Sequence, residues 1–296
     1  MLRTLALCLT LACGPLAGQT VTVDTYRGPV EVETMPERIA VFDVAALDTL
    51  AALGVTPAGV IEPIYVTYLG DATAGAERVG TLFEPDFEAV AALGPDLIIA
   101  GGRSYEAVPD LARIAPTIDM TIWEDVVGQG LDRLEAYGEI FGKQDEAAAL
   151  AVAFQEKLAA TRAAVAGKGR ALIVMTVGPK VSGYGAGGRF GWLHDALELP
   201  EAVEAVEDAT HGEAISFEFI RDADPEILIV VDRQAAIGQG GAAAKATLDN
   251  ALVRETRAWK TGRVIYLDSA PLYIAGGGIQ SMSIILDQIA AHVTGG

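Results

Sequence analysis

Cysteine and histidine are scarce in this sequence, and their scarcity excludes several kinds of chemistry. The 296 residues include two cysteines, Cys8 and Cys13, and three histidines. Because both cysteines lie within the first 18 residues, the remainder of the chain can form no disulfide and offers no thiolate. A zinc site usually draws on several cysteines or histidines, and the G-x-S-x-G motif of many serine hydrolases does not occur. Thiol chemistry, a serine nucleophile of that type and a histidine-rich metal site are therefore disfavoured.

Positive charge is also in short supply. The chain carries 21 lysine and arginine residues against 40 aspartate and glutamate residues, which gives a net charge of −19. Nucleic acid and anionic membrane surfaces repel so acidic a chain, and we expect neither as a partner. A group of arginines directed at one spot would be informative here, because the surrounding surface repels anions.

Long hydrophobic runs are absent, and no segment reaches the ~18 consecutive apolar residues of a membrane-spanning helix. The chain instead begins with Met-Leu-Arg, followed by a short apolar run at 5–12 and then small residues. This pattern predicts a secretory signal peptide over residues 1–18 and a periplasmic mature protein that begins near Gln19. Residues 10–12 make a poor lipobox before Cys13, so the sequence favours a free mature protein over a lipoprotein.

Short runs of valine, isoleucine and leucine recur along the chain, each followed by a turn and a helical pattern. Continuous apolar runs of this length are typical of buried parallel strands. Their alternation with helices indicates an α/β fold with parallel sheets. The predicted strands lie at 38–42, 96–100, 171–175, 227–231 and 264–267, with helical patterns at 45–53 and 87–93.

One segment occurs twice, once in each half of the chain. Residues 86–100 and 216–230 share a Phe-Glu pair at the second and third positions, a proline at the tenth and an apolar strand at the end. An arginine stands three residues past each strand, at Arg103 and Arg233. Such internal similarity suggests that the two halves are related lobes.

A long helical segment separates the two halves. Residues 144–166 are rich in alanine, leucine, glutamate and lysine and contain neither glycine nor proline. These residues predict one helix of about 30 Å, which would act as a stiff hinge and end at the glycines that follow. The predicted organisation is an N-terminal lobe (19–143), a linking helix (144–167) and a C-terminal lobe (168–296).

Three arginines occupy positions where open parallel sheets bind their ligands, beyond the carboxyl ends of the strands. Arg103 and Arg233 follow strands, and Arg189 stands where a helix is expected to begin. In so acidic a chain, three arginines at such positions predict a site for an anion with several aligned oxygens, because the planar guanidinium group matches that geometry.

Two further residues could reach a metal ion in that site. His211 stands in a polar loop before the second copy of the repeat, where a histidine can face a cleft; a structural role is the alternative. Tyr273 lies between the last strand and the last helix, and its phenolate oxygen would suit hard Fe(III). The alternative for Tyr273 is packing under the glycine turn beside it. His194 is expected in the core or at a helix cap, and His292 on the surface.

Several segments resemble those of periplasmic ferric-catecholate siderophore-binding proteins from iron-uptake ABC transporters, which form a class III solute-binding family with a long-helix hinge. The resemblance covers nearly the whole mature chain and rests on residues 43–50, 95–99, 189–195, 210–216, 231–233 and 249–253. It implies that Arg103, Arg189 and Arg233 hold the catecholate oxygens of a ferric siderophore. It also implies that His211 and Tyr273 complete the coordination of iron when the siderophore supplies only four donors.

The same resemblance implies the protein's partners. Glu88 and Glu218, one in each lobe, would dock on arginines of an inner-membrane ABC permease. We expect a binding protein and not an enzyme, acting as a monomer, with no intrinsic cofactor and with Fe(III) bound only as the siderophore complex.

Two other interpretations compete with this one. A haem- or cobalamin-binding protein of the same fold would explain the two lobes, but it gives no reason for three converging arginines beside a histidine and a tyrosine. The G-x-G-x-x-G motif at 183–188 is typical of NAD-dependent oxidoreductases. Export would remove such an enzyme from the cytoplasmic cofactor, and no acidic residue ends a following strand, so this is the more distant alternative.

Overall fold

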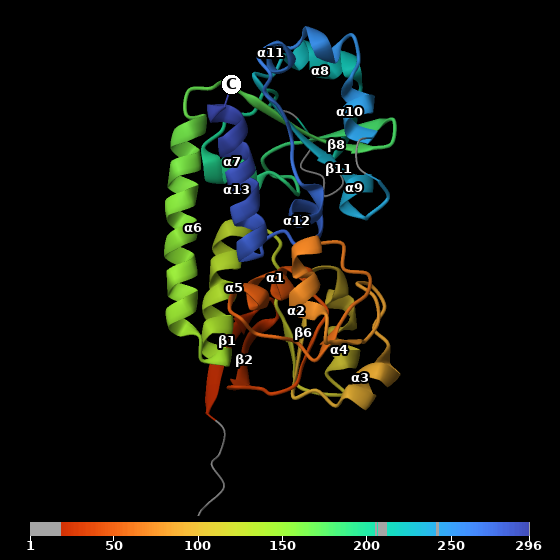
Figure 1. Ribbon diagram of the computed structural model, residues 1–296, viewed down its shortest axis with the longest axis vertical. Helices are drawn as coiled ribbons and strands as arrows, with labels where there is room; N and C mark the ends of the chain where they lie inside the picture. Colours follow the sequence, from red (N-terminus) through yellow and green to blue (C-terminus); the bar gives the residue numbers. More distant parts are fainter. Residues whose placement is uncertain (1–18, 205, 207–211, 241–242, 296) are drawn as a thin grey trace, which may run out of the picture.

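The computed structural model describes residues 19–204, 206, 212–240 and 243–295. Two lobes, each built on its own five-stranded sheet, lie one above the other, with helices running along one side of both (Figure 1). The predicted signal peptide and His211 lie outside the described residues. Among the helices that the structure does describe, none has the length and apolar character needed to span a membrane.

The N-terminal lobe is centred on a sheet of five parallel strands in the order β5-β4-β3-β6-β7. Every residue of β6 is buried, as expected for a strand that is covered on both faces. The strands are β3 (Ile39–Val41), β4 (Gly59–Val60), β5 (Glu77–Arg78), β6 (Leu97–Ala100) and β7 (Thr117–Asp119), preceded by the hairpin of β1 (Thr20–Thr25) and β2 (Gly28–Glu33). The helices are α1 (Val44–Ala52), α2 (Gly70–Thr73), α3 (Phe87–Leu93), α4 (Val108–Leu111) and α5 (Val126–Phe141), with short 3₁₀ turns η1 (Thr67–Leu69) and η2 (Gly102–Ala107).

The C-terminal lobe contains a mixed sheet in the order β10-β9-β8-β11-β12. Its strands are β8 (Ala171–Val177), β9 (Lys180–Tyr184), β10 (Glu213–Ile215), β11 (Ile227–Asp232) and β12 (Val264–Tyr266). The helices are α7 (Trp192–Leu197), α8 (Phe217–Ala223), α9 (Arg233–Ala236), α10 (Ala243–Leu248), α11 (Arg257–Lys260), α12 (Ser269–Ile274) and α13 (Ile279–Thr294), with one 3₁₀ turn, η3 (Val253–Glu255).

The predicted α/β fold with parallel sheets in two lobes is confirmed, and the second sheet adds two strands that the sequence did not suggest. β8, β11 and β12 are parallel, whereas β9 and β10 run antiparallel to their neighbours. β8 turns back directly at Gly178, whose φ is +57°, and pairs with β9 after a two-residue connection. Such a connection joins only antiparallel strands, because a parallel pair needs a long crossover.

The two copies of the repeated segment fold in the same way. Asp86 and Ser216 cap α3 and α8, and their side-chain oxygens accept hydrogen bonds from backbone N–H groups of the first turn. Each helix ends at a left-handed residue, Gly94 or Asp224. The chain then enters the buried strand, β6 or β11, and an arginine follows that strand in each lobe.

The helix α6 (Gln144–Val165) links the lobes, where one long helix was predicted over 144–166. Acidic residues occupy its first turn and Arg162 its last, in keeping with the helix dipole. Its buried residues, Ala147, Phe154, Thr161 and Val165, recur every four or seven positions, so they form one stripe. This stripe faces α13 and α5, and α13 lies beside α6 (Figure 1).

A buried polar junction holds α13 of the C-terminal lobe against α1 of the N-terminal lobe. The carboxylate of Asp48 accepts hydrogen bonds from the backbone N–H groups of Gln280 (2.8 Å) and Ser281 (3.0 Å), and from the hydroxyl of Tyr68. A side chain from one lobe thus caps a helix of the other. A Cβ at Gly278 would approach the Asp48 carboxyl to 2.5 Å, so the close approach requires glycine there.

Candidate functional site

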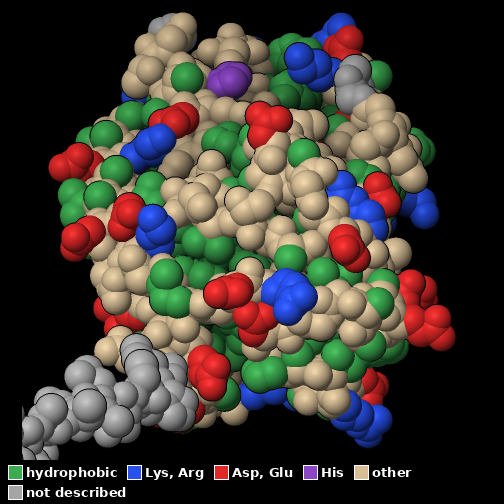
Figure 2. All heavy atoms as spheres, turned by 60° about the horizontal axis from the view of Figure 1, so that its bottom comes forward, with side chains coloured by type: hydrophobic (Ala, Val, Ile, Leu, Met, Phe, Trp, Pro, Cys, Tyr) green, Lys and Arg blue, Asp and Glu red, His purple; other side chains and the backbone are tan. Residues whose placement is uncertain are grey.

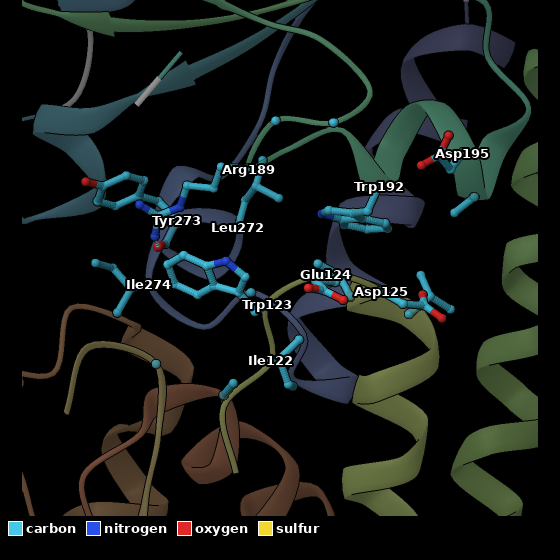
Figure 3. A pocket seen from close by; sticks show the side chains of 18 of the residues that line it. Ile122, Trp123, Glu124, Asp125, Arg189, Trp192, Asp195, Leu272, Tyr273 and Ile274 are labelled. Carbon is cyan, nitrogen blue, oxygen red and sulfur yellow. Dashed lines mark hydrogen bonds between the residues drawn. The ribbon is translucent and has the colours of Figure 1, made fainter. Parts of the chain in front are cut away.

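A cleft of about 1180 Å³ lies between the lobes, and Figure 3 shows how its walls are arranged. Strand ends and helix starts of both lobes line it, as expected for open sheets. The N-terminal lobe contributes Arg103 and the segment Ile122–Val127, the C-terminal lobe contributes Arg189, Trp192 and Tyr273, and α6 contributes Leu158 and Arg162.

Arg103 reaches across the cleft from the N-terminal lobe. The chain leaves β6 through Gly101, where an added Cβ would meet the backbone nitrogen of Thr121 at 2.7 Å, and it turns at Gly102 with φ +55°. This path places Arg103 on η2 with its Nη2 donating to the backbone carbonyl of Tyr273 at 2.9 Å. An arginine of one lobe is therefore anchored on the other lobe.

Arg189 comes from the C-terminal lobe and converges on the same point. Its Nη2 donates to the carbonyl oxygen of Tyr273 at 2.7 Å, and its guanidinium carbon lies 4.1 Å from the centre of the Tyr273 ring. Burial and the neighbouring charge of Arg103 lower the pKa of Arg189 to about 10. In the part of the chain that the structure describes, neither Arg103 nor Arg189 forms an ion pair with a carboxylate.

Tyr273, on α12, is surrounded by cations. Burial alone would raise the pKa of its phenol, but the charge of Arg189, a hydrogen bond from Arg233 and the charge of Arg103 outweigh burial, so the pKa lies below its ordinary value. The arginines therefore make this phenol easier to deprotonate than an ordinary tyrosine, and the phenolate is the form in which tyrosine binds Fe(III). Figure 3 shows Tyr273 and Arg189 together at one end of the cleft.

Arg233 contacts this cluster without lining the cleft. It is the first residue of α9, directly after β11, and buried Asp232 caps that helix by accepting from the N–H groups of Gln234 and Ala235. The structure thus brings the three predicted arginines around Tyr273, two of them on the cleft wall and one bonded to the tyrosine side chain.

The three histidines lie in different environments. His211 falls outside the described residues, so its predicted role as an iron ligand stays a prediction. His194 is buried on α7 with Nδ1 2.8 Å from the carbonyl oxygen of Leu199, in line with the expected core position. His292 is exposed near the end of α13, as expected.

Glu88 and Glu218 lie away from the cleft. Both are exposed and stand in the first turns of α3 and α8. These helices occupy opposite ends of the molecule, one in each lobe, on the side away from α6 (Figure 1). Their placement follows from the repeated segment, because each glutamate is the second helical residue after the cap.

Several residues of the cleft were not anticipated from the sequence. Phe83, Tyr105 and Trp123 line it and are exposed aromatic side chains. Acidic side chains line it as well: Asp43, Glu124, Asp125 and Asp195. Part of this set could have been found from its position in the sequence. Residues 120–125 directly follow β7, and ligands of open parallel sheets bind beyond the ends of the strands.

The G-x-G-x-x-G segment adopts no dinucleotide-binding geometry. The fingerprint requires a strand, a glycine turn and a helix that leads to a parallel strand. Here the motif begins within β9, which is antiparallel to β8, and leads to the six-residue α7. Its glycines instead fold a compact loop whose last residues, Gly187 and Gly188, line the cleft beside Arg189.

The two lobes, the long linking helix and the cleft between them define a class III solute-binding protein. A model of the periplasmic binding protein family matches residues 39–271. The chain belongs to this family.

Individual relatives agree with that assignment. The petrobactin-binding protein YclQ of Bacillus subtilis is 33% identical over 91% of this chain and 86% of its own length. The periplasmic catecholate-siderophore binding protein VctP of Vibrio cholerae matches with a TM-score of 0.86 and 30% identity, covering 94% of this chain and 100% of that one. A TroA-like periplasmic binding protein from Xylanimonas cellulosilytica matches with a TM-score of 0.85 and 36% identity, covering 95% and 99%. All three are named as binding proteins.

Proposed function

We propose that this protein binds a ferric catecholate siderophore between its lobes in the periplasm, after removal of residues 1–18, and delivers it to an ABC permease. The observation that carries the proposal is the convergence of Arg103, Arg189 and Arg233 on Tyr273 at one end of the cleft. The relatives named for petrobactin and for catecholate siderophores support the same class of ligand.

The charges of the cleft favour this class of ligand. A ferric complex of catecholates is anionic, and its oxygens lie in pairs that guanidinium groups can contact side by side. Arg103 and Arg189 form no ion pair with a carboxylate among the described residues and line the cleft, so the bound complex would supply negative charge that the protein supplies only in part.

Tyr273 and His211 are the proposed protein ligands of the iron. A siderophore with four donor oxygens leaves two of the six positions of octahedral Fe(III) open. The lowered pKa of Tyr273 suits it to fill one of them as a phenolate, and we assign the other to His211. Iron is then cargo bound with the siderophore, and the protein needs no cofactor of its own.

The test is a titration of the purified mature protein with a panel of ferric siderophores and haem, followed by quenching of intrinsic fluorescence. Tyr273, Trp123 and Trp192 line the cleft, so a bound ligand would lie beside the side chains whose fluorescence is followed. Tight binding of ferric catecholates, with weaker binding of haem and of ferric hydroxamates, is the expected result. Preference for haem over every catecholate would refute the proposal.

A further inference from the structure

The cleft continues beyond the arginines toward α6, and this second end has a different character. Figure 3 shows Arg189 and Tyr273 at one end, Trp192 and Asp195 at the other, and Trp123 and Glu124 between them. We call the second end the acidic arm of the cleft; it is formed by Trp123, Glu124, Asp125, Trp192 and Asp195. A ligand that fills the whole cleft must complement the arginines at one end and the carboxylates at the other.

The carboxylates of the acidic arm have no cationic partner. Across the described ranges, Glu124, Asp125 and Asp195 take part in no salt bridge. Arg162, the basic residue that α6 presents to this part of the cleft, is already engaged, since it donates to the carbonyl of Ala196 and lies 3.3 Å from Glu198. The acidic arm therefore retains negative charge that the protein does not neutralise.

Trp192 supplies an independent sign that a ligand belongs there. Only 8% of its surface is exposed, yet its indole N–H donates to no described residue, and Figure 3 shows the ring nitrogen facing the open centre of the cleft. A buried indole usually finds an acceptor for this proton. Here the nitrogen reaches the open cleft, so a ligand with an acceptor such as an amide carbonyl could receive this proton in place of water.

Trp123 adds a surface that suits a cation. It is 56% exposed and lines the cleft, and it is the part of the acidic arm that lies nearest Arg189 and Tyr273 (Figure 3). The face of an indole is the most favourable aromatic surface for an ammonium group. The carboxylates and the indole rings of Trp123 and Trp192 together form a site that suits a positively charged amine.

We propose that the acidic arm binds a protonated amine carried by the spacer between the catecholates, so that the native ligand pairs an anionic iron centre with a cationic arm. This inference rests on the proposed function and specifies its substrate class. Glu124 and Asp195 supply the charge, and Trp192 donates to an amide carbonyl of the spacer. A bare metal ion is a poorer occupant, because no group of three or more metal-binding side chains occurs among the described residues.

The experiment compares two ferric complexes that have the same catecholate groups and differ only in the spacer between them. Each is a linear bis-catecholamide, one with a secondary amine in the spacer and one in which that amine is N-acetylated and neutral. At low salt we expect the parent protein to bind the amine form about tenfold more tightly, as a charge-assisted contact requires. Glu124→Gln with Asp195→Asn should abolish this preference, and the acetylated form, which has no charged amine, should bind no more weakly than it binds the parent.

The variants are chosen to leave the fold intact. Among the described residues, the side chains of Glu124 and Asp195 accept no hydrogen bond, whereas Asp125 caps α5 and is left in place. Asp132→Asn with Glu135→Gln, two exposed acids of α5 outside the cleft, is the matched control and should keep the preference.

Each other outcome has a distinct meaning. Equal affinity of the parent protein for the two complexes would overturn the acidic arm while leaving catecholate binding intact. A preference that persists in the Glu124→Gln, Asp195→Asn variant would also overturn it. Failure of the parent to bind either complex would refute the proposed function, and the acidic arm with it. The preference should shrink as salt screens the charges.

Discussion

At the residue scale, the protein compensates the charge of Arg189 only in part. Its guanidinium group is largely withdrawn from water and lies near Arg103, and both effects lower its pKa. The carbonyl and ring of Tyr273 partly offset this cost, and the single charge of its phenolate would balance only one of three arginines. An anionic ligand would supply further negative charge, so the arrangement favours the binding of an anion in the cleft.

We therefore expect Arg103→Ala and Arg189→Ala each to weaken binding of a ferric catecholate at least tenfold, because a hydrogen bond to a charged group contributes about 1.5–3 kcal/mol. Arg233→Ala should also weaken binding, in part through Tyr273, whose side chain it contacts. Fluorescence titration measures the dissociation constants. Arg254→Ala, at an exposed arginine outside the cleft, is the control and should bind as the parent does. If a protein that carries Arg103→Ala, Arg189→Ala and Arg233→Ala together bound the ferric catecholate as tightly as the parent, the assignment of these arginines to the binding site would be wrong.

Tyr273 allows a test of direct coordination. A tyrosinate–iron bond adds a charge-transfer band, so Tyr273→Phe should remove the visible shift that accompanies binding. The same change should cost affinity for a four-donor siderophore and spare a six-donor one, whose iron is already saturated. His211→Ala should show the same selectivity. Because the donors bind iron without their protons, affinity should fall at acidic pH. Equal losses with both siderophore classes would mean that these residues only shape the cleft.

The positions of the arginines could be predicted from the sequence, but the rest of the cleft could not. Arg103 and Arg233 follow recognisable buried strands, and strand ends of parallel sheets share one edge. Trp123 and Glu124 follow β7, which is only three residues long and gives too short an apolar run to recognise. Trp192 lies on a short helix, and which side of it meets the cleft depends on how the lobes are packed.

At the scale of the elements, the junction between α1 and α13 fixes one lobe on the other. Burial raises the pKa of Asp48 to about 7, although hydrogen bonds from Tyr68, Gln280 and Ser281 act in the opposite direction. Burial likewise raises the pKa of Asp43, the cap of α1, to about 6. Both carboxyls hold a proton more tightly in the folded protein than in the unfolded chain.

The stability of the protein should therefore fall as the pH rises. A carboxyl of raised pKa contributes stability that is fully present below its ordinary value, here 3.8, and that is lost as the pH passes through its folded value, about 7 for Asp48. Asp48→Asn cannot ionise, so its stability relative to the parent should improve by about 2 kcal/mol between pH 5 and pH 8. Urea unfolding at several pH values measures this difference.

The control for this prediction is Asp71→Asn, at an exposed position of α2, which should follow the parent at every pH. If the free energies of unfolding of Asp48→Asn and the parent differed by the same amount at every pH from 5 to 8, Asp48 would not titrate in that range. A second effect is expected at all pH values: the amide can no longer accept from all three donors, and an unpaired buried group costs about 1–3 kcal/mol.

The antiparallel strands show why the elements were only partly predictable. The continuous apolar runs that form the core of β6, β8 and β11 appear plainly in the sequence. β9 mixes exposed Lys180 with buried Val181 and Tyr184 over five residues, and β10 has only three residues, none of them fully buried. Such short edge strands are specified by pairing with a neighbour, not by their own periodicity.

At the scale of the whole molecule, the surface is acidic and the charges are interspersed. On the face shown in Figure 2, basic side chains stand among acidic ones, consistent with a chain of net charge −19. The lobes are joined by α6 and by the α1–α13 junction, so large changes in the angle between them would require breaking buried hydrogen bonds. The two lobe ends should therefore keep a nearly fixed separation.

That rigidity makes the proposed docking residues testable as a pair. Glu88 and Glu218 project from equivalent first turns at the two ends of the molecule and lie outside the cleft. Reversing both charges, with Glu88→Lys and Glu218→Lys, should leave the siderophore dissociation constant unchanged. If these glutamates dock on arginines of the permease, as the resemblance implies, transport should be abolished, because the reversed charges would repel those arginines. Uptake of labelled ferric siderophore by proteoliposomes that contain the cognate permease measures this.

The matched control reverses two acids that stand on the linking side of the molecule. Glu135→Lys with Glu156→Lys changes the net charge by the same amount on exposed positions of α5 and α6, so it separates docking from a general loss of negative charge. Transport should persist in this control. Each single reversal at Glu88 or Glu218 should reduce transport less than the pair, since one lobe can still engage. Normal uptake by the Glu88→Lys, Glu218→Lys protein would reject the docking role and leave ligand capture as the only assigned activity of the two lobes.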